Sequence, residues 1–335
     1  QTLKKSNVIA FFAIFVLFSI PFAALLHYKT LNLAYWIGLA GQPKLVNIPN
    51  LQEFHPPRKE ISRFVVVPHH LFDNNLLAHG LPTLGGYFQL LNKRMVEYWR
   101  EIGAATKGGR MYLKLPKNLC RKSLQADKFI DVNFLRAANV GYIVSYIPIH
   151  GDDIIFISGP EPALFEPRCH QTFKKKLKID LRDRATPKGA FVYKVRRPFP
   201  RIFFAKTAVY SERDFSSPMF WDEVRAEIKN YGIVWKNDHR VGGAEPDQKA
   251  ELKNWKWSAE SDTLTVNVAA PAGGILVLNT PYLPFWQASS RDNKLEIWPA
   301  NGFQMALTLP ANTTEIQLRY NRPFPSDVVK KWLKL

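Results

Sequence analysis

An uninterrupted apolar run near the start of the chain most strongly limits how this sequence can fold. The segment from Val8 to Leu26 (VIAFFAIFVLFSIPFAALL) contains 19 residues without a charge, and Ser19 is its one polar side chain. A helix of roughly 20 apolar residues crosses the hydrocarbon core of a bilayer. The run therefore predicts one transmembrane helix.

Two other structures compete for this run, a cleaved secretory signal peptide and a helix buried in a protein core. The apolar part of a signal peptide normally has about 7 to 15 residues, and buried core helices are usually also shorter than this run. Pro21 near its end is tolerated in membrane helices. The lysines on its two sides balance, so charge does not decide the orientation; they are Lys4 and Lys5 before the run and Lys29 and Lys44 after it.

The rest of the chain has the composition of a folded, basic protein. Of 335 residues, 46% are hydrophobic and 13% aromatic, which excludes a disordered chain and favours two folded domains. There are 46 Lys and Arg against 28 Asp and Glu, a net charge of +18. The two cysteines, Cys120 and Cys169, are too few for a disulfide scaffold and lack zinc-site spacing, although an oxidising compartment would allow one bridge. The chain begins at Gln1, so we treat it as a piece whose upstream part is unseen.

Helix and strand patterns interleave in the segment 63–165. Arg63–Val67 (RFVVV) and Val140–Ile147 (VGYIVSYI) have the β-branched and aromatic content of strands. The apolar spacing over Tyr87–Ile102 predicts a helix, and Asp131 is placed to cap a shorter one. This order of elements predicts an α/β unit.

From residue 189 onward the pattern changes to strands, with a helical insertion near 217–230. Three runs alternate strictly between apolar and polar residues: 263–268, 303–309 and 315–320. Such alternation is typical of strands with one buried and one solvated face. Several of these strands, separated by turn residues, predict an antiparallel β-sandwich.

The predicted fold class is therefore α+β, with one transmembrane helix, an α/β unit and a C-terminal antiparallel β-sandwich. The expected boundaries are 1–42 for the helix and membrane-interface segment, 43–62 for a linker, 63–165 for the α/β extracytoplasmic unit, 166–188 for a basic connector, 189–322 for the sandwich and 323–335 for a tail.

Residues that carry chemistry form no complete active site in the sequence. His69 and His70 are adjacent and would point to opposite faces of a strand, so they do not form a metal-binding pair. Gly80–Gly86 lacks the lysine of a phosphate-binding loop. Asp152 and Asp153 fit either a carboxylate pair or, more often, a solvated turn. We therefore expect no cofactor, no metal site and no identifiable catalytic residue.

Basic residues are concentrated between Arg168 and Lys206, where 13 Lys and Arg stand against two Asp. Near an expected membrane helix, this charge favours membrane lipid headgroups, lipid-linked sugar phosphates or acidic glycans over nucleic acid as partners. A solvated cationic loop is the alternative. The candidate residues for an anionic lipid or phosphate patch are Lys174, Lys175, Lys176, Lys178, Arg196 and Arg197.

Four segments in order carry a family resemblance: Asn74–Trp99, Phe134–Ile149, Phe191–Tyr210 and Leu264–Tyr320. Together they resemble the C-terminal part of the YfhO-like family of bacterial polytopic membrane proteins, which are regarded as glycosyltransferase-like enzymes using lipid-linked sugar donors. The fourth segment departs from the family, because glycines usual in its turns are replaced here.

The resemblance implies a location at the cell membrane, with the region after the apolar run on the extracytoplasmic side. It also places the family's catalytic acidic residue on a loop near N-terminal spans, and no position of this chain matches that loop. The expected function is acceptor handling by a membrane glycosyltransferase-like protein that acts on lipid-linked sugars or cell-envelope glycans. The alternative is a non-catalytic, membrane-anchored binding or assembly subunit that docks on other membrane subunits.

Aromatic side chains are the candidates for glycan contact, because the C–H faces of sugars stack on flat apolar rings while neighbouring polar groups bind the hydroxyls. Each candidate is also a residue type common in cores or turns. The glycan-binding candidates are Asn75, His79, Tyr87, Tyr282 and Trp286.

Overall fold

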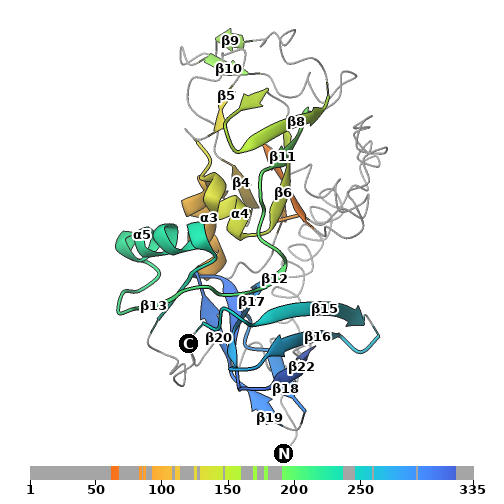
Figure 1. Cartoon of the computed structure of the whole chain (residues 1–335). Helices are drawn as coiled ribbons and strands as arrows, with labels where there is room; N and C mark the ends of the chain where they lie inside the picture. The colour runs from red at the N-terminus through yellow and green to blue at the C-terminus, as the bar shows by residue number, and fades with distance from the viewer. Residues whose placement is uncertain are drawn as a thin grey trace, which may run out of the picture. The chain divides into compact units, whose positions relative to one another are not determined.

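The computed structural model describes a large part of the chain after residue 61 (Figure 1). The described residues are 62–67, 83–84, 86–87, 93–107, 110–113, 124–126, 129–145, 148–159, 169–171, 177–179, 191–236, 246–258, 260–291 and 293–321. The chain divides into two units, Gln1–Asn47 and Ile48–Leu335, and every described residue lies in the second.

A four-stranded mixed sheet with the order β1-β6-β11-β8 forms the first part of this structure. Strand β1 (Arg63–Val67) runs parallel to β6 (Val140–Ser145), and β11 (Phe191–Val195) runs antiparallel to both β6 and β8 (Ile154–Ser158). Every residue of β6 is buried, in agreement with its β-branched and aromatic sequence. The sheet therefore has a strand covered on both faces at its centre.

Local sequence signals start two of the helices. Asp131 precedes α4, and its Oδ1 accepts hydrogen bonds from the backbone N–H groups of Asn133 (3.0 Å) and Phe134 (3.4 Å). Ser217 precedes α5, whose first residue is Pro218, a position where the missing N–H of proline costs nothing. The described helices are α3 (Lys93–Ile102), α4 (Val132–Ala137), α5 (Pro218–Glu227) and the 3₁₀ helix η3 (Ile228–Asn230).

Several short strands pair outside the larger sheets. They are β2 (Gly86–Tyr87), β4 (Arg110–Leu113) and β3 (Ala104–Lys107) in one sheet, β5 (Leu124–Gln125) with β7 (Ile149–His150), β9 (Cys169–Gln171) with β10 (Leu177–Ile179), and β13 (Ala208–Ser211) with β14 (Ile233–Lys236). The pairs β5–β7 and β13–β14 are parallel, and the other pairs are antiparallel.

Two antiparallel sheets are built from the C-terminal part of the chain. The first has the order β12-β17-β21-β20, with β12 (Ile202–Phe204), β17 (Gly274–Pro281), β21 (Gln304–Leu309) and β20 (Ile297–Ala300). The second has the order β15-β16-β22-β18-β19, with β15 (Glu251–Ser258), β16 (Thr263–Ala270), β22 (Thr313–Tyr320), β18 (Trp286–Ser290) and β19 (Asn293–Leu295). We call the first the middle sheet and the second the outer sheet.

One hydrophobic core fills the space between the middle and outer sheets. Leu276 and Leu278 of β17 belong to the same buried cluster as Val266 of β16 and Leu318 of β22. Buried positions alternate with partly buried ones on β16 and with exposed ones over most of β22, as the sequence pattern predicted. The outer sheet thus has one buried face and one solvated face.

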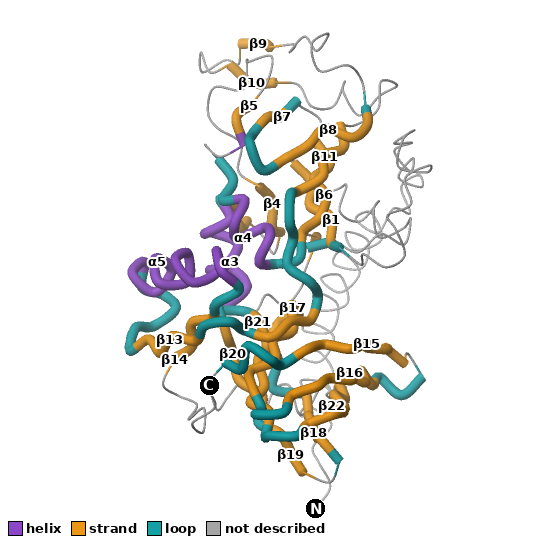
Figure 2. Tube along the Cα trace, viewed as in Figure 1, coloured by secondary structure: helices purple, strands orange, loops and turns teal. Residues whose placement is uncertain are grey.

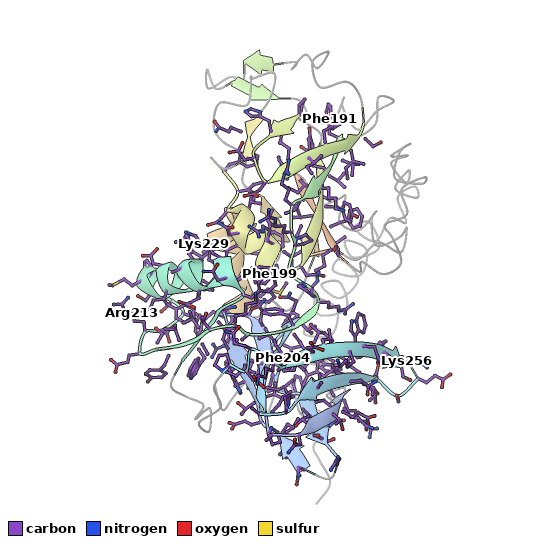
Figure 3. The ribbon with its side chains drawn as sticks, viewed as in Figure 1. Phe191, Phe199, Phe204, Arg213, Lys229 and Lys256 are labelled. Atoms are coloured by element: carbon purple, nitrogen blue, oxygen red, sulfur yellow. The ribbon has the colours of Figure 1, made fainter. Side chains whose placement is uncertain are left out.

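A second hydrophobic core covers the opposite face of the middle sheet. Ile275 and Val277, which alternate with the leucines of β17, join a buried cluster that includes Phe134 of α4. In this cluster Phe199, labelled in Figure 3, stacks on Tyr231 with ring centroids 4.1 Å apart. Figure 2 shows the helices on one side of the middle sheet and the outer sheet on the other. The middle sheet therefore lies between two cores.

This arrangement corrects the prediction for β21, where the alternation in 303–309 predicted a solvated face. Gln304 and Ala306 are both buried. The reason is that the second core covers the face on which these residues lie. An alternating pattern reports the polarity of side chains, and it does not reveal that another part of the chain covers the polar side.

The predicted fold class is wrong as stated. The described structure is mostly strands, arranged in several sheets, with few helices. Across the described ranges, no helix has the length and apolar character needed to cross a membrane. The apolar run Val8–Leu26, on which the predicted transmembrane helix rested, lies outside the described residues. What the structure contains is a β-rich fold with several antiparallel sheets.

Two element boundaries also differ from the predictions. The helix expected over Tyr87–Ile102 begins at Lys93, and Tyr87 lies in strand β2. Strand β11, expected in the sandwich segment 189–322, pairs instead with β6 and β8. The mixed sheet thus takes a strand from beyond the expected connector 166–188, because strand pairing depends on partners distant in sequence.

Candidate functional site

The described part of the chain contains a cleft of about 790 Å³. It lies where the end of α3, the start of α4 and the turn between β7 and β8 meet. Its volume is within the range of small-molecule sites, about 300 to 1,000 Å³. The lining residues are Glu101, Ile102, Gly103, Gln125, Ala126, Phe129, Ile130, Asp131, Val132, Asn133, His150, Gly151, Asp152, Asp153 and Ile154.

The backbone holds the two helix ends together at one wall of the cleft. The N–H of Asp131 donates a hydrogen bond of 3.0 Å to the carbonyl of Ile102, the last residue of α3. Gly103 follows with a φ of +100°, a conformation that favours glycine. A Cβ at this position would lie 2.2 Å from the carbonyl oxygen of Phe129. This wall therefore requires a glycine.

Arg225 of α5 fixes two carboxylates at the edge of the cleft. Its Nε donates to Asp131 Oδ2 (3.0 Å) and its Nη2 to Glu101 Oε2 (2.9 Å), while Nη1 pairs with Asp222 Oδ1 (2.8 Å). Burial raises the pKa of Glu101 above its usual value, and the hydrogen bond from Arg225 opposes that shift. The single positive charge of Arg225 thus offsets part of the negative charge of Glu101, Asp131 and Asp222.

The turn between β7 and β8 supplies three exposed polar side chains. His150, Asp152 and Asp153 are exposed, and no hydrogen bond or ion pair joins these three side chains to another described residue. The turn itself is held by its backbone: the carbonyl of Asp153 accepts from the N–H of Arg196 (2.8 Å). Strand β7 also pairs with β5, which sets Gln125 opposite His150. These polar side chains border the open part of the cleft.

Apolar and amide groups complete the lining. Phe129 is half-buried and packs against the second core, and Ile130 and Ile154 are buried beside it. Asn133, in the first turn of α4, accepts a hydrogen bond from Arg136 Nη1 (3.2 Å) through its Oδ1, which leaves its Nδ2 as a donor. The cleft therefore presents hydrogen-bonding groups next to an aromatic and aliphatic wall.

The charge of the cleft is opposite to that of the whole chain. Its described lining contains four carboxylates and no Lys or Arg, although the chain carries a net charge of +18. Carboxylates repel phosphate and other anions. Among the residues that the structure describes, no group of three or more His, Cys, Asp or Glu has the geometry to hold a metal ion. The lining thus suits a neutral or cationic polar ligand.

The structure describes three of the five residues predicted to bind glycans, and these three lie in different segments. Asn75 and His79 lie outside the described residues, and Tyr87 is described only as part of β2. Tyr282 follows β17, is half-buried and packs against the core between the middle and outer sheets. Trp286 begins β18, and its ring lies 5.1 Å from that of Tyr320. Neither Tyr282 nor Trp286 is among the described residues that line the cleft.

The predicted anionic lipid or phosphate patch is described at only three of its six positions. Lys174, Lys175 and Lys176 lie outside the described residues, and Lys178 is described only as part of β10. Arg196 and Arg197 are exposed after β11, and the carbonyl of Arg197 accepts from Arg136 Nε (3.1 Å).

The cleft residues were missed because they come from separate segments. The sequence pattern indicates only a helix cap at Asp131 and favours a solvated turn at Asp152 and Asp153. Two contacts bring these residues together: the pairing of β5 with β7 and the backbone hydrogen bond from Asp131 to Ile102. Neither contact is indicated by a local sequence pattern.

Comparison with known proteins found no matching family model, curated protein or solved structure.

Proposed function

We propose that the described part of the chain binds a neutral glycan in the cleft and acts as the acceptor-handling region of a glycosyltransferase-like protein working on lipid-linked sugars or cell-envelope glycans. The observation that carries this proposal is the lining, where the exposed side chains of His150, Asp152 and Asp153, which have no hydrogen bond or ion pair to another described residue, border the same cleft as Asn133 and Phe129. Carboxylates and amides bind sugar hydroxyls, and apolar walls pack against the C–H faces of the ring.

The charge of the cleft favours an acceptor over a donor. Lipid-linked sugar donors carry phosphate, and the carboxylates of Asp152 and Asp153 would repel it. A neutral oligosaccharide meets no such repulsion. The cleft therefore binds the acceptor, and the donor phosphate binds elsewhere in the proposed protein.

The segment resemblance to YfhO-like proteins supports the wider setting of this proposal. It includes the segments that form β6, β11 and most of the outer sheet. On this basis we place the glycan-binding region on the extracytoplasmic side of the cell membrane, as part of a YfhO-like protein.

The test is calorimetric titration of the full chain with neutral oligosaccharides of two to six hexose units. The variant Asp152→Asn/Asp153→Asn keeps the size of both side chains and changes their hydrogen bonding and charge. We expect it to weaken binding by about tenfold or more, because each carboxylate that binds a hydroxyl contributes a charge-assisted hydrogen bond.

A matched control is Glu212→Gln/Glu260→Gln, which removes two exposed carboxylates away from the cleft. It makes the same change in net charge and should bind oligosaccharides like the original chain. Equal affinity in the cleft variant and in the control would overturn the proposal, as would a failure of the unchanged protein to bind any oligosaccharide of the series.

A second candidate function is that of a binding or assembly subunit, and one observation favours it. Ile155, Phe156 and Ile157 of β8 are exposed, and β8 ends the strand order of the mixed sheet within the described residues. An exposed apolar strand at a sheet edge can accept a strand from another chain. Here Phe156→Glu should abolish self-association or partner capture in sedimentation experiments, and unchanged sedimentation would remove this candidate.

A further inference from the structure

Three aromatic side chains meet at one end of the core between the middle and outer sheets. They are Trp257 of β15, Trp286 of β18 and Tyr320 of β22, and we call this group the aromatic end. The ring centroids of Trp257 and Trp286 are 6.1 Å apart, and those of Trp286 and Tyr320 are 5.1 Å apart. The strands that carry these residues all belong to the outer sheet (Figure 1).

The strand register explains how the three rings come together. Trp286 lies directly opposite Tyr320, and Trp257 lies opposite Leu264, which in turn pairs with Leu318. Leu264 and Leu318 are buried in the core, so the side chains of these rows share the inner face of the sheet. The aromatic end therefore closes the core at its edge.

Trp257 is held in place but remains accessible. It is 42% exposed, although it contacts Trp286 edge to face. Its neighbour Lys256 points away from the sheets into solvent (Figure 3). A flat ring fixed by other rings, with a large part of its surface in water, is a preorganised platform for a ligand.

Hydrogen-bonding groups accompany the platform. Trp286 Nε1 is buried and has no hydrogen-bond partner among the described residues, which is a cost that folded proteins usually avoid. Burial raises the pKa of Tyr320, and the charge of Asp262 raises it further, so its hydroxyl stays protonated and can donate. The aromatic end thus combines an exposed apolar face with an unpaired donor.

We propose that the aromatic end binds a hexose ring of a glycan, with the C–H face of the sugar stacked on Trp257 and a sugar hydroxyl accepting a hydrogen bond from Trp286 Nε1. Trp286 Nε1 is buried in the structure without a ligand, so this hydrogen bond requires a side-chain change on binding, which is common at binding sites. The hydrocarbon chain of a lipid has no acceptor and would leave the N–H unpaired. The inference shares its ligand class with the proposed function, but its site has no residue in common with the cleft.

The test is affinity electrophoresis of the full chain through acidic native gels that contain soluble starch, galactomannan or mixed-linkage β-glucan. Binding to the immobile polysaccharide slows migration, and the dissociation constant follows from its dependence on polysaccharide concentration. We expect at least one of the three to retard the protein. Trp257→Ala should raise that dissociation constant about tenfold, and Trp257→Phe, which keeps a smaller ring, about two- to threefold.

The matched control is Tyr210→Ala, because Tyr210 is an aromatic residue that is 39% exposed and lies on β13, outside the outer sheet. It should leave the retardation unchanged. Circular dichroism of each variant checks that the fold is kept.

The outcomes separate this inference from the proposed function. If Trp257→Ala loses the retardation and Asp152→Asn/Asp153→Asn keeps it, the polysaccharide binds at the aromatic end and not in the cleft. If Asp152→Asn/Asp153→Asn loses the retardation and Trp257→Ala keeps it, the inference about the aromatic end is overturned and the proposed function is not. Unchanged retardation in Trp257→Ala overturns the inference. The absence of retardation by all three polysaccharides also overturns it. Binding of the protein to phosphatidylglycerol vesicles through Trp257, without such retardation, has the same consequence.

Discussion

Arg63 joins the mixed sheet to the middle sheet, because its Nη2 donates a hydrogen bond to the backbone carbonyl of Asn279 in β17. Its Nη1 donates to the carbonyl of Ala138 at the end of α4 (2.9 Å). Burial lowers the pKa of Arg63 to about 10, so the guanidinium is still charged at neutral pH. A buried cation with two carbonyl partners is stable only if both partners stay in place. The two parts of the described structure are thus fixed to one another by a polar contact.

Gln304 of β21 extends this contact into a buried hydrogen-bond network. Its Nε2 donates to the carbonyl of Ala137 (2.8 Å) and to Asn279 Oδ1, and its Oε1 accepts from Asn301 Nδ2 (2.7 Å). Asn301 Oδ1 in turn accepts from the N–H of Val234 (2.9 Å). The buried Gln304 side chain is therefore hydrogen-bonded both to α4, through Ala137, and to β17, through Asn279.

The first prediction is that Gln304→Leu lowers the free energy of unfolding by about 2 to 4 kcal/mol. The leucine fills a similar volume, but it removes the donor to the carbonyl of Ala137 and to Asn279 Oδ1 and the acceptor of one hydrogen bond from Asn301 Nδ2. Urea denaturation followed by tryptophan fluorescence measures the change. Gln317→Leu, at an exposed position of β22, should change stability by only about 0.5 kcal/mol or less. Equal stability of the two variants would show that the network contributes nothing.

The second prediction concerns Gly103 at the cleft wall. Gly103→Ala should destabilise the protein by more than about 1 kcal/mol, because alanine is strained at positive φ and its Cβ would meet the backbone of Phe129. Gly151→Ala is the matched control in the same cleft, since its Cβ would find Ala126 Cβ at an ordinary contact of 3.4 Å. Denaturant midpoints of the two variants give the comparison, and a shift of the same size in both would contradict the prediction.

The elements that the sequence predicted correctly are those with local causes. Asp131 caps α4 through hydrogen bonds within two or three residues, and Pro218 begins α5 at the position where proline is favoured. The alternation on β16 predicted its buried face correctly because the residues of the other face are only partly buried. Apolar–polar alternation predicts the buried face of a strand reliably where one face packs on a core and the other face is solvated.

The features that the sequence did not predict depend on distant contacts. Gln304 is polar at a position that alternation assigns to solvent, and only the second core explains its burial. Strand β11 joins the mixed sheet because β6 and β8 pair with it. Trp257 was not identified as a candidate, since its contact with Trp286 crosses two intervening strands. A site built from residues on different strands produces no regular residue spacing in the sequence.

The third prediction is a pH dependence that originates at Glu101. Burial raises the pKa of this carboxyl above 4.5 in the folded state, against the opposing effect of Arg225, with Asp222 and Asp131 raising it slightly further. The folded state therefore binds the proton more tightly than the unfolded chain just above pH 4.5. By linkage, the contribution of Glu101 to stability falls as the pH rises through its folded-state pKa.

Glu101→Gln removes this titration and isolates its effect. The free energy of unfolding of the original chain minus that of the variant should decrease from about pH 4 to about pH 7. Urea denaturation at intervals of half a pH unit measures this difference. Glu315→Gln, at an exposed position of β22, serves as the control and should show no such trend. A difference that stays constant or increases with pH would contradict the sign of the shift.

The fourth prediction connects the mixed sheet to the cleft through Tyr193 of β11. Its hydroxyl oxygen accepts a hydrogen bond of 3.0 Å from the N–H of Ile149, next to His150 of the cleft. Burial raises the pKa of Tyr193 to about 12, so the hydroxyl stays neutral in any ordinary buffer. Tyr193→Phe should cost about 1 to 2 kcal/mol of stability and speed amide hydrogen exchange at Ile149, because a buried N–H loses its acceptor. The control is Tyr210→Phe at an exposed position, and unchanged exchange at Ile149 would mean that β7 is held without this bond.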